Sequence, residues 1–146
     1  MSLAAFLESA GFRRVPLSRT GVGHFEAEGA LNDHPVRVLI DTGAASTVAS
    51  LSRVNEFGLE VKPLARCGAG AGRANLQVFK VDGAELRLGV VVPKVAALLA
   101  MDLAHVNAAL AEKGVPSVDV ILGVDVFDAH AAVIDYGSAS LFLREA

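Results

Sequence analysis

The sequence lacks tryptophan altogether, and aromatic residues make up only 5% of its 146 residues. It has a single cysteine, Cys67, so no disulfide can form within the chain and the fold has to rest on its apolar core. Hydrophobic residues reach 53%, and a chain of this length can bury a core without a metal. We therefore expect one folded domain over residues 1–146, with residues 1–20 as an N-terminal extension that includes a short helix.

Charge is also scarce, at 20% of residues with a formal net charge of −3. The basic residues are scattered, so the clustered basic face that nucleic-acid binding requires is missing. The longest apolar run, residues 89–101, is interrupted by Pro93 and Lys94 and is too short to span a bilayer. Residues 1–10 lack the basic and apolar regions of a signal peptide. We expect no nucleic-acid partner and no membrane segment in this chain. The expected location of the chain is cytoplasmic, or periplasmic or membrane-tethered if a signal or anchor was trimmed.

Residues that bind metals or act as thiol nucleophiles are few. The four histidines, His24, His34, His105 and His130, are far apart, and none belongs to a His-x-x-x-His arrangement. No metal and no cofactor are therefore expected. Cys67 shares no recognisable motif with a histidine, so we interpret it as a small apolar side chain on a strand.

Glycine, in contrast, is abundant, with 14 residues, which favours tight turns and β structure over a helix bundle. Residues 24–31 alternate between Phe25, Ala27 and Gly29 on one side and polar or small residues on the other, and residues 36–40 form a continuous apolar run, which predicts a hairpin. Further strands are expected over residues 14–19, 61–67, 75–81, 84–92, 118–122, 132–135 and 140–143. Helical patterns cover residues 3–10, a segment from Ser50 or Ser52 to Gly58, residues 103–113 and a turn over 124–129. The pattern is typical of a mostly β protein with two or three short helices.

The segment richest in chemistry is residues 38–48, Val-Leu-Ile-Asp-Thr-Gly-Ala-Ala-Ser-Thr-Val, in which an apolar strand delivers Asp41. Two such carboxylates within hydrogen-bonding reach cannot both ionise, so they share a proton. The ionised carboxylate can deprotonate a water while the protonated one hydrogen-bonds the substrate carbonyl. Gly43 lets the backbone offer an N–H to the carboxylate, and Thr42 can bond across to a partner loop. Ala44 and Ala45 leave room for a substrate backbone.

A second element strengthens this interpretation. Ile121, Leu122 and Gly123, followed by a short helical segment, resemble the hydrophobic-hydrophobic-glycine signature of aspartic proteases, whose strand crosses beneath the active-site loop. Together with residues 38–48 and the closing residues 132–143, this signature makes the chain resemble the retropepsin-like aspartic proteases, especially bacterial cellular members.

The resemblance implies a closed β-barrel of the acid protease fold with two or three short helices, and a homodimer with one Asp-Thr-Gly loop per subunit. It implies that Asp41 is the catalytic aspartate and that Thr42 clamps the two loops together. It also implies a flap hairpin over the cleft, which would contact the substrate through five small residues: Gly68, Ala69, Gly70, Ala71 and Gly72. Viral members carry acidic residues that grip the substrate where this chain has Ala45 and Ser46, and their dimers are joined by interleaved chain ends.

The expected function is therefore an aspartic endopeptidase that acts on a peptide or protein substrate. The alternative is a non-catalytic retropepsin-fold module for peptide binding or dimerisation. A phosphate loop of an actin-like ATPase also places Asp-x-Gly after an apolar strand, but that fold needs two lobes, and the glycine-rich run lacks the Gly-Lys-Ser/Thr ending. Asp125, Asp128 and Asp135 are not followed by Thr-Gly or Ser-Gly, so surface, capping or turn roles are expected for them instead of a second catalytic role.

Overall fold

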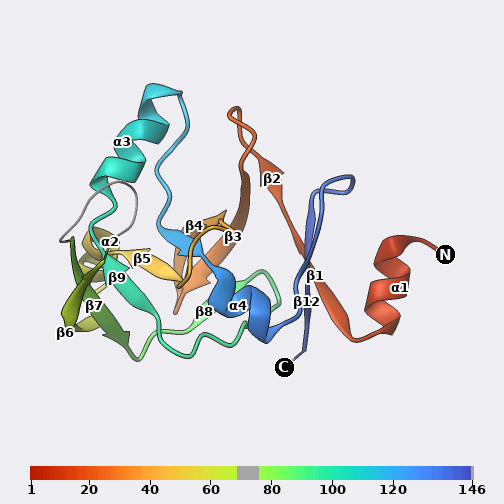
Figure 1. Cartoon of the computed structure of the whole chain (residues 1–146), viewed down its shortest axis with the longest axis horizontal. Helices are drawn as coiled ribbons and strands as arrows, with labels where there is room; N and C mark the ends of the chain where they lie inside the picture. The colour runs from red at the N-terminus through yellow and green to blue at the C-terminus, as the bar shows by residue number, and fades with distance from the viewer. Residues whose placement is uncertain (69–75, 146) are drawn as a thin grey trace.

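The computed structural model describes residues 1–68 and 76–145, in which strands dominate (Figure 1). The strands are β1 (Phe12–Pro16), β2 (Ser18–Arg19), β3 (Phe25–Leu31), β4 (His34–Ile40), β5 (Val48–Ser50), β6 (Glu60–Gly68), β7 (Leu76–Asp82), β8 (Leu86–Leu88), β9 (Leu99–Met101), β10 (Val120–Leu122), β11 (Val133–Asp135) and β12 (Ser140–Arg144). The helices are α1 (Leu3–Ser9), α2 (Leu51–Glu56), α3 (Ala104–Glu112) and α4 (Val124–Ala129). The expected mostly β architecture is confirmed, with four helices in the described residues instead of two or three.

The strands form two sheets. The smaller one has the order β1-β12-β11, so the first and last strands of the chain pair with each other beside α1 (Figure 1). The larger one has the order β2-β3-β4-β10-β5-β9-β7-β6, with β8 paired to β3 outside this order. Among the described strands no pairing joins β2 to β6, and β2 contains only two residues, so the closed barrel is not confirmed.

Strand β10 occupies the centre of the larger sheet. It runs parallel to β4, with Leu122 opposite Ile40, and antiparallel to β5, with Val120 opposite Ala49. Val120 and Leu122 are fully buried, as expected for a short apolar strand covered on both faces. The strand that leads into the Asp-Thr-Gly segment and the strand that leaves it are therefore held together by β10.

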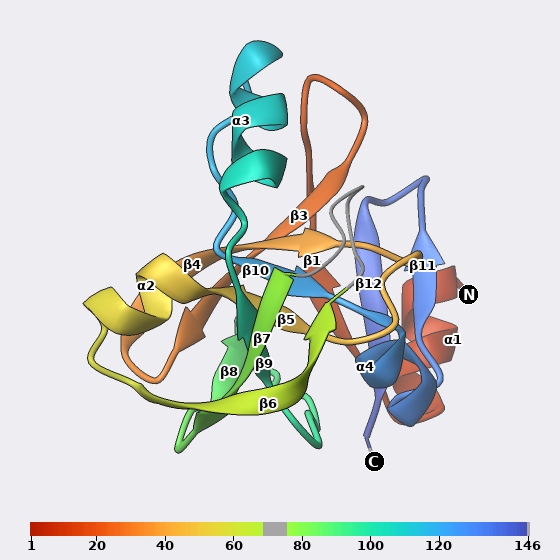
Figure 2. The same cartoon turned by 60° about the vertical axis from the view of Figure 1, so that its left-hand side comes forward.

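Two apolar clusters stabilise the structure. The main cluster contains side chains from both sheets and includes Leu31, Leu88 and Leu122 among its fully buried side chains. A smaller cluster beneath α3 contains Leu110, Val115 and Val118, with Leu39 packed against it. Figure 2 shows α3 and the connection between β2 and β3 at the same end of the larger sheet. Within the described residues, no helix is long and apolar enough to cross a membrane.

The differences from the expected elements are local. The strands β5 and β9 were not predicted, because a three-residue strand is too short for an alternation pattern. Only Leu86–Leu88 of the expected strand 84–92 is a strand, because the chain turns at Gly89, which has a φ of 60°. The alternation expected for β3 is also wrong at one position, since Glu26 is buried together with its neighbours Phe25 and Ala27.

Candidate active site

Asp41 lies directly after β4, in a turn that the backbone holds from two sides. Its N–H donates to the carbonyl of Leu122 at 3.0 Å, and its carbonyl accepts from the N–H of Ala44 at 3.2 Å. The N–H of Gly43 donates to Asp41 Oδ1 at 2.8 Å, which is the contact expected from the motif. A Cβ at position 43 would lie 3.2 Å from Oδ1, so the glycine allows a close approach that a side chain would crowd.

The segment Ile121, Leu122 and Gly123 lies against this turn. The N–H of Val124 donates to the carbonyl of Ala44 at 2.8 Å. A Cβ on Gly123 would come within 2.7 Å of the Ala44 carbonyl oxygen and 2.8 Å of the Ser46 carbonyl oxygen. These contacts are with backbone atoms, which cannot rotate away. Glycine is therefore required at position 123 by lack of space, and the strand-to-helix connection supports the loop after Asp41.

A buried polar pair joins the same two segments. The Thr47 side chain is fully buried, its hydroxyl donates to Asp125 Oδ1 at 2.8 Å, and its oxygen accepts from the N–H of Gly123 at 3.1 Å. Asp125 is half-buried in the first turn of α4, where the helix dipole favours a negative charge. The surface or capping role expected for Asp125 is therefore wrong. The contact joins residues far apart in the chain, so no local pattern could have revealed it.

The other two aspartates behave as expected. Asp128 is exposed on α4. Asp135 is a turn residue, since its Oδ1 accepts from the N–H of Gly137 at 3.1 Å and its Oδ2 accepts from the hydroxyl of Ser138 at 2.6 Å. In the described part of the chain, no group of three or more His, Cys, Asp or Glu side chains is arranged to hold a metal ion.

The remaining predicted site residues divide into two groups. Thr42, Gly43 and Ala45 are exposed and Ala44 is half-buried, so the turn presents one side to solvent. The predicted flap begins at Gly68, the last residue of β6, opposite Leu76 of β7. The other four flap residues, Ala69, Gly70, Ala71 and Gly72, lie outside the described residues. The two strands expected on either side of them are confirmed as the antiparallel pair β6–β7.

In this mostly β chain, an apolar strand and the glycine that follows it support the turn of Asp41. This arrangement defines the class as an aspartic protease fold. The family model described as aspartyl protease matches residues 27–126, which is more than half of the chain, and the chain belongs to this family. The expected family is thereby confirmed, while no curated protein is detectably similar in sequence.

Two solved structures show the same fold. The chain is similar to a retropepsin-like aspartic protease from Rickettsia conorii, with a TM-score of 0.58 and 16% identity over 90% of each chain. It is also similar to the retroviral protease-like domain of Ddi1 from Leishmania major, with a TM-score of 0.56 and 15% identity over 83% of this chain and 88% of that one. At these identities the likeness establishes the fold and leaves the substrate open.

Proposed function

We propose that this protein is an aspartic endopeptidase that hydrolyses peptide bonds with a water held between two Asp41 carboxylates, one from each subunit of a homodimer. The observation that carries the proposal is the turn of Asp41 itself. Its backbone is fixed by Leu122, its Oδ1 is fixed by the N–H of Gly43, and its Oδ2 has no hydrogen-bond partner among the described residues. One carboxylate oxygen is therefore available for a water or a second carboxylate.

The second carboxylate is proposed to come from a second copy, because the other candidate aspartates of the chain already accept hydrogen bonds from other groups. Asp125 accepts the hydrogen of the Thr47 hydroxyl, and both oxygens of Asp135 are bonded within its own turn. The exposed hydroxyl of Thr42 has no hydrogen-bond partner in the described part of the subunit, which fits a contact across a two-fold axis.

The reaction follows from a pair of carboxylates that share one proton. The ionised Asp41 takes a proton from the water, whose oxygen bonds to the carbonyl carbon, while the partner subunit's Asp41 gives its proton to the carbonyl oxygen. The carboxyl group formed on the first Asp41 then protonates the amide nitrogen, and the C–N bond breaks. One hydroxyl of the intermediate returns its proton to the partner subunit's Asp41. A carboxylic acid and an amine leave, and the pair again holds one proton.

The proposed dimer uses the exposed side of residues 42–45. Interleaved chain ends are not proposed, because β1 already pairs with β12 of the same subunit over Phe12 to Pro16, and β11 covers the other edge of β12. The terminal strands therefore close within one chain. In the proposed complex Ala44, Ala45 and residues 68–72 contact the peptide substrate.

A peptide-library digest from acidic to neutral pH tests the proposal. Wild-type protein should cleave, and Asp41→Asn should lower kcat/KM by at least about 10³-fold, because it removes the general base. Asp128→Asn, the same change at an exposed aspartate, is the matched control and should cleave normally. Cleavage at the wild-type rate by Asp41→Asn would contradict the proposal.

A second measurement tests the dimer. Specific activity should rise with protein concentration in the range where sedimentation shows monomer converting to dimer, because neither subunit holds a complete site. Activity per subunit that stays constant while the protein is monomeric would rule out the shared site. A dimer without cleavage of any peptide would favour the non-catalytic binding module.

A further inference from the structure

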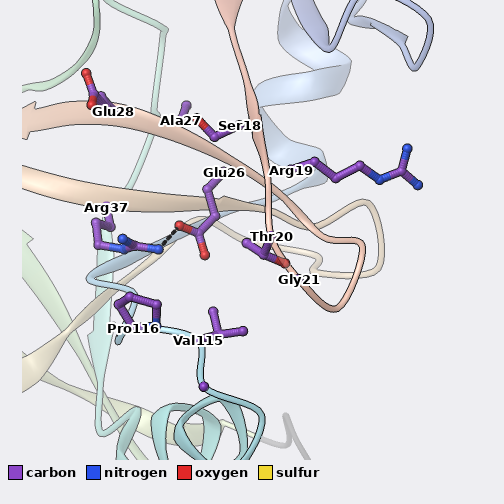
Figure 3. Close-up of a pocket in the computed structure, with 11 residues that line it drawn as sticks. Ser18, Arg19, Thr20, Gly21, Glu26, Ala27, Glu28, Arg37, Val115 and Pro116 are labelled. Atoms are coloured by element: carbon purple, nitrogen blue, oxygen red, sulfur yellow. Dashed lines mark hydrogen bonds and ion pairs between the residues drawn. The ribbon is translucent and has the colours of Figure 1, made fainter.

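A pocket of about 260 Å³ lies between the connection of β2 to β3 and the segment that follows α3 (Figure 3). The residues that matter to its chemistry are Thr20, Gly21, Glu26, Arg37, Val115 and Pro116. We call it the Glu26 pocket. Figure 3 shows the Glu26 carboxylate between Arg37 and Thr20, with Val115 and Pro116 on the opposite side of the space. A charged group therefore faces an apolar wall.

Glu26 is an unusual residue to find inside such a pocket. Its side chain is only 8% exposed, and Oε1 forms an ion pair with the guanidinium of Arg37. Oε2 is buried and has no hydrogen-bond partner among the described residues, and the same holds for Arg37 Nε. A buried carboxylate oxygen without a donor is costly, and Glu26 lines the pocket, so a small rotation of its carboxylate would bring Oε2 to a donor from outside the chain.

The charges around the pocket favour a cationic occupant. Glu26 and the exposed Glu28 both line it, whereas Arg37 is the one guanidinium directed at Glu26 among the residues that the structure describes. Arg19 also belongs to the rim, but its guanidinium lies 5.2 Å from the ring centre of Phe25 and 5.4 Å from that of Tyr136, and it extends away from the pocket (Figure 3). The Glu28 carboxylate also points away from this space in Figure 3, so the acceptor left over in the pocket is Glu26 Oε2, because Arg37 is paired with Oε1.

The pocket is joined to the turn of Asp41 through the pairing of β3 with β4. Glu26 is directly opposite Leu39 in the pairing of β3 with β4, and Leu39 precedes Asp41 by two residues. Asp41 follows the last residue of β4, Ile40, and two residues of extended chain span about 7 Å. That spacing is about the length of two residues of an extended peptide, so a substrate held at Asp41 can reach the pocket with a neighbouring side chain.

We propose that the Glu26 pocket is a subsite that binds a basic side chain of the substrate, preferably arginine. The inference rests on the proposed function and adds a substrate class to it. A guanidinium offers several N–H donors in one plane, so it can satisfy Glu26 Oε2 while its flat face packs on Val115 and Pro116. A lysine ammonium can donate to the carboxylate but has no flat face to pack on Val115 and Pro116, so it should bind more weakly.

Peptides that differ at one position test this preference. Quenched fluorescent substrates with arginine, lysine, citrulline, leucine or glutamate would be compared at each position flanking the cleaved bond. Citrulline has the shape of arginine without its charge. At one position wild type should cleave the arginine peptide at least about 10-fold faster in kcat/KM than the citrulline peptide. Glu26→Gln should abolish that ratio, while Glu28→Gln, at the exposed edge, should keep most of it.

Binding in a catalytically silent background separates this inference from the proposed function. Nα-acetyl-arginine amide and its citrulline analogue would be titrated into Asp41→Asn, with the backbone amides of Thr20 and Val115 followed by NMR. The arginine compound should shift these amides and bind at least about 10-fold more tightly, and adding Glu26→Gln should remove the difference.

A blocking variant covers the case in which Glu26→Gln fails to fold. Gly21 has open space where a Cβ would lie and no left-handed backbone strain, so Gly21→Phe should fold and place a ring at the pocket mouth. It should weaken arginine binding as Glu26→Gln does.

Equal affinity for arginine and citrulline, or cleavage by wild type without a basic preference at any position, would overturn the subsite. Selective arginine binding with no cleavage of any peptide would overturn the proposed function alone.

Discussion

Two turns in this molecule share the same local chemistry, Asp-x-Gly with the glycine N–H donating to the first carboxylate oxygen. The distance is 2.8 Å from Gly43 to Asp41 Oδ1 and 3.1 Å from Gly137 to Asp135 Oδ1. Their surroundings differ. Asp135 also accepts the Ser138 hydroxyl on Oδ2, so both of its oxygens are bonded locally. Asp41 keeps Oδ2 without a partner in the described residues, while its backbone N–H is anchored on Leu122.

The comparison shows that the turn itself does not make an aspartate available for chemistry. The turn of Asp135 connects β11 to β12 and uses its carboxylate to hold its own backbone, as such turns commonly do. The turn of Asp41 is held instead by β10 and by the start of α4, which leaves the carboxylate partly free. External support thus replaces local bonding, and substitutions in that support should affect Asp41 and spare Asp135.

The largest effect is expected from Gly123→Ala, which disturbs the support that β10 and the start of α4 give to the turn of Asp41. The new methyl would meet the Ala44 and Ser46 carbonyl oxygens at 2.7 and 2.8 Å, so the loop or the strand has to move. We expect a loss of about 3 kcal/mol in the free energy of unfolding, and a Tm lower by roughly 6–12 °C. Thermal and urea unfolding measure this change.

The matched control for that substitution is Gly137→Ala in the turn of Asp135. Its Cβ would be 3.4 Å from Asp135 Oδ1, an ordinary contact, so stability should change by less than about 1 kcal/mol. Equal destabilisation by the two substitutions would show that β10 gives the Asp41 turn no special support.

The sequence predicted the features that depend on residues close to each other along the chain. The hairpin of β3 and β4 was predicted from its apolar pattern, and the turn of Asp135 from Tyr136-Gly137 chemistry. The motif also predicted the hydrogen bond from Gly43 to Asp41. Each of these features depends on residues within about one strand or turn of each other.

The features that escaped prediction depend on contacts between distant segments. Asp125 was expected at the surface or as a cap, because no neighbouring residue in the sequence indicates its contact with the buried Thr47 hydroxyl. Glu26 was expected on the polar side of β3, because the alternation of this strand does not show that Glu26 is buried in an ion pair with Arg37. Local patterns report which residues are apolar, whereas burial of a polar residue is decided by what tertiary packing places over it.

A smaller effect is expected when the polar link between loop and helix is cut by Thr47→Val. The substitution keeps the volume but leaves the Gly123 N–H and the Asp125 carboxylate without the hydroxyl that joins them. We expect destabilisation by about 2 kcal/mol in chemical unfolding, because a buried donor then lacks a partner. In the turn of Asp135, Arg14 donates to Ser140 and to the Ser138 carbonyl and not to Asp135 itself, so the prediction sharpens the contrast between the two turns.

A double-mutant cycle assigns that loss to the proposed contact. Thr47→Val combined with Asp125→Ala should be less destabilising than the sum of the two single changes, by about 1 kcal/mol or more. Thr47→Val combined with Asp128→Ala should be additive, since Asp128 is exposed on the same helix. Additivity in both cycles would mean that the Thr47–Asp125 hydrogen bond contributes nothing to stability.

The smallest change in stability, and the most direct test of the comparison, is expected from Gly43→Ala against Gly137→Ala. Both substitutions add one methyl beside the Oδ1 of an Asp-x-Gly turn, at 3.2 Å from Asp41 and 3.4 Å from Asp135, and neither glycine has a left-handed φ. Stability should fall by less than about 1 kcal/mol in each case. Only Gly43→Ala should lower peptide cleavage, by about 10-fold in kcat, because a displacement of a few tenths of an ångström misplaces a proton-transferring carboxylate. If both variants cleave like wild type, the close approach of Gly43 has no part in positioning Asp41, and the difference between the two turns lies entirely in the support from β10.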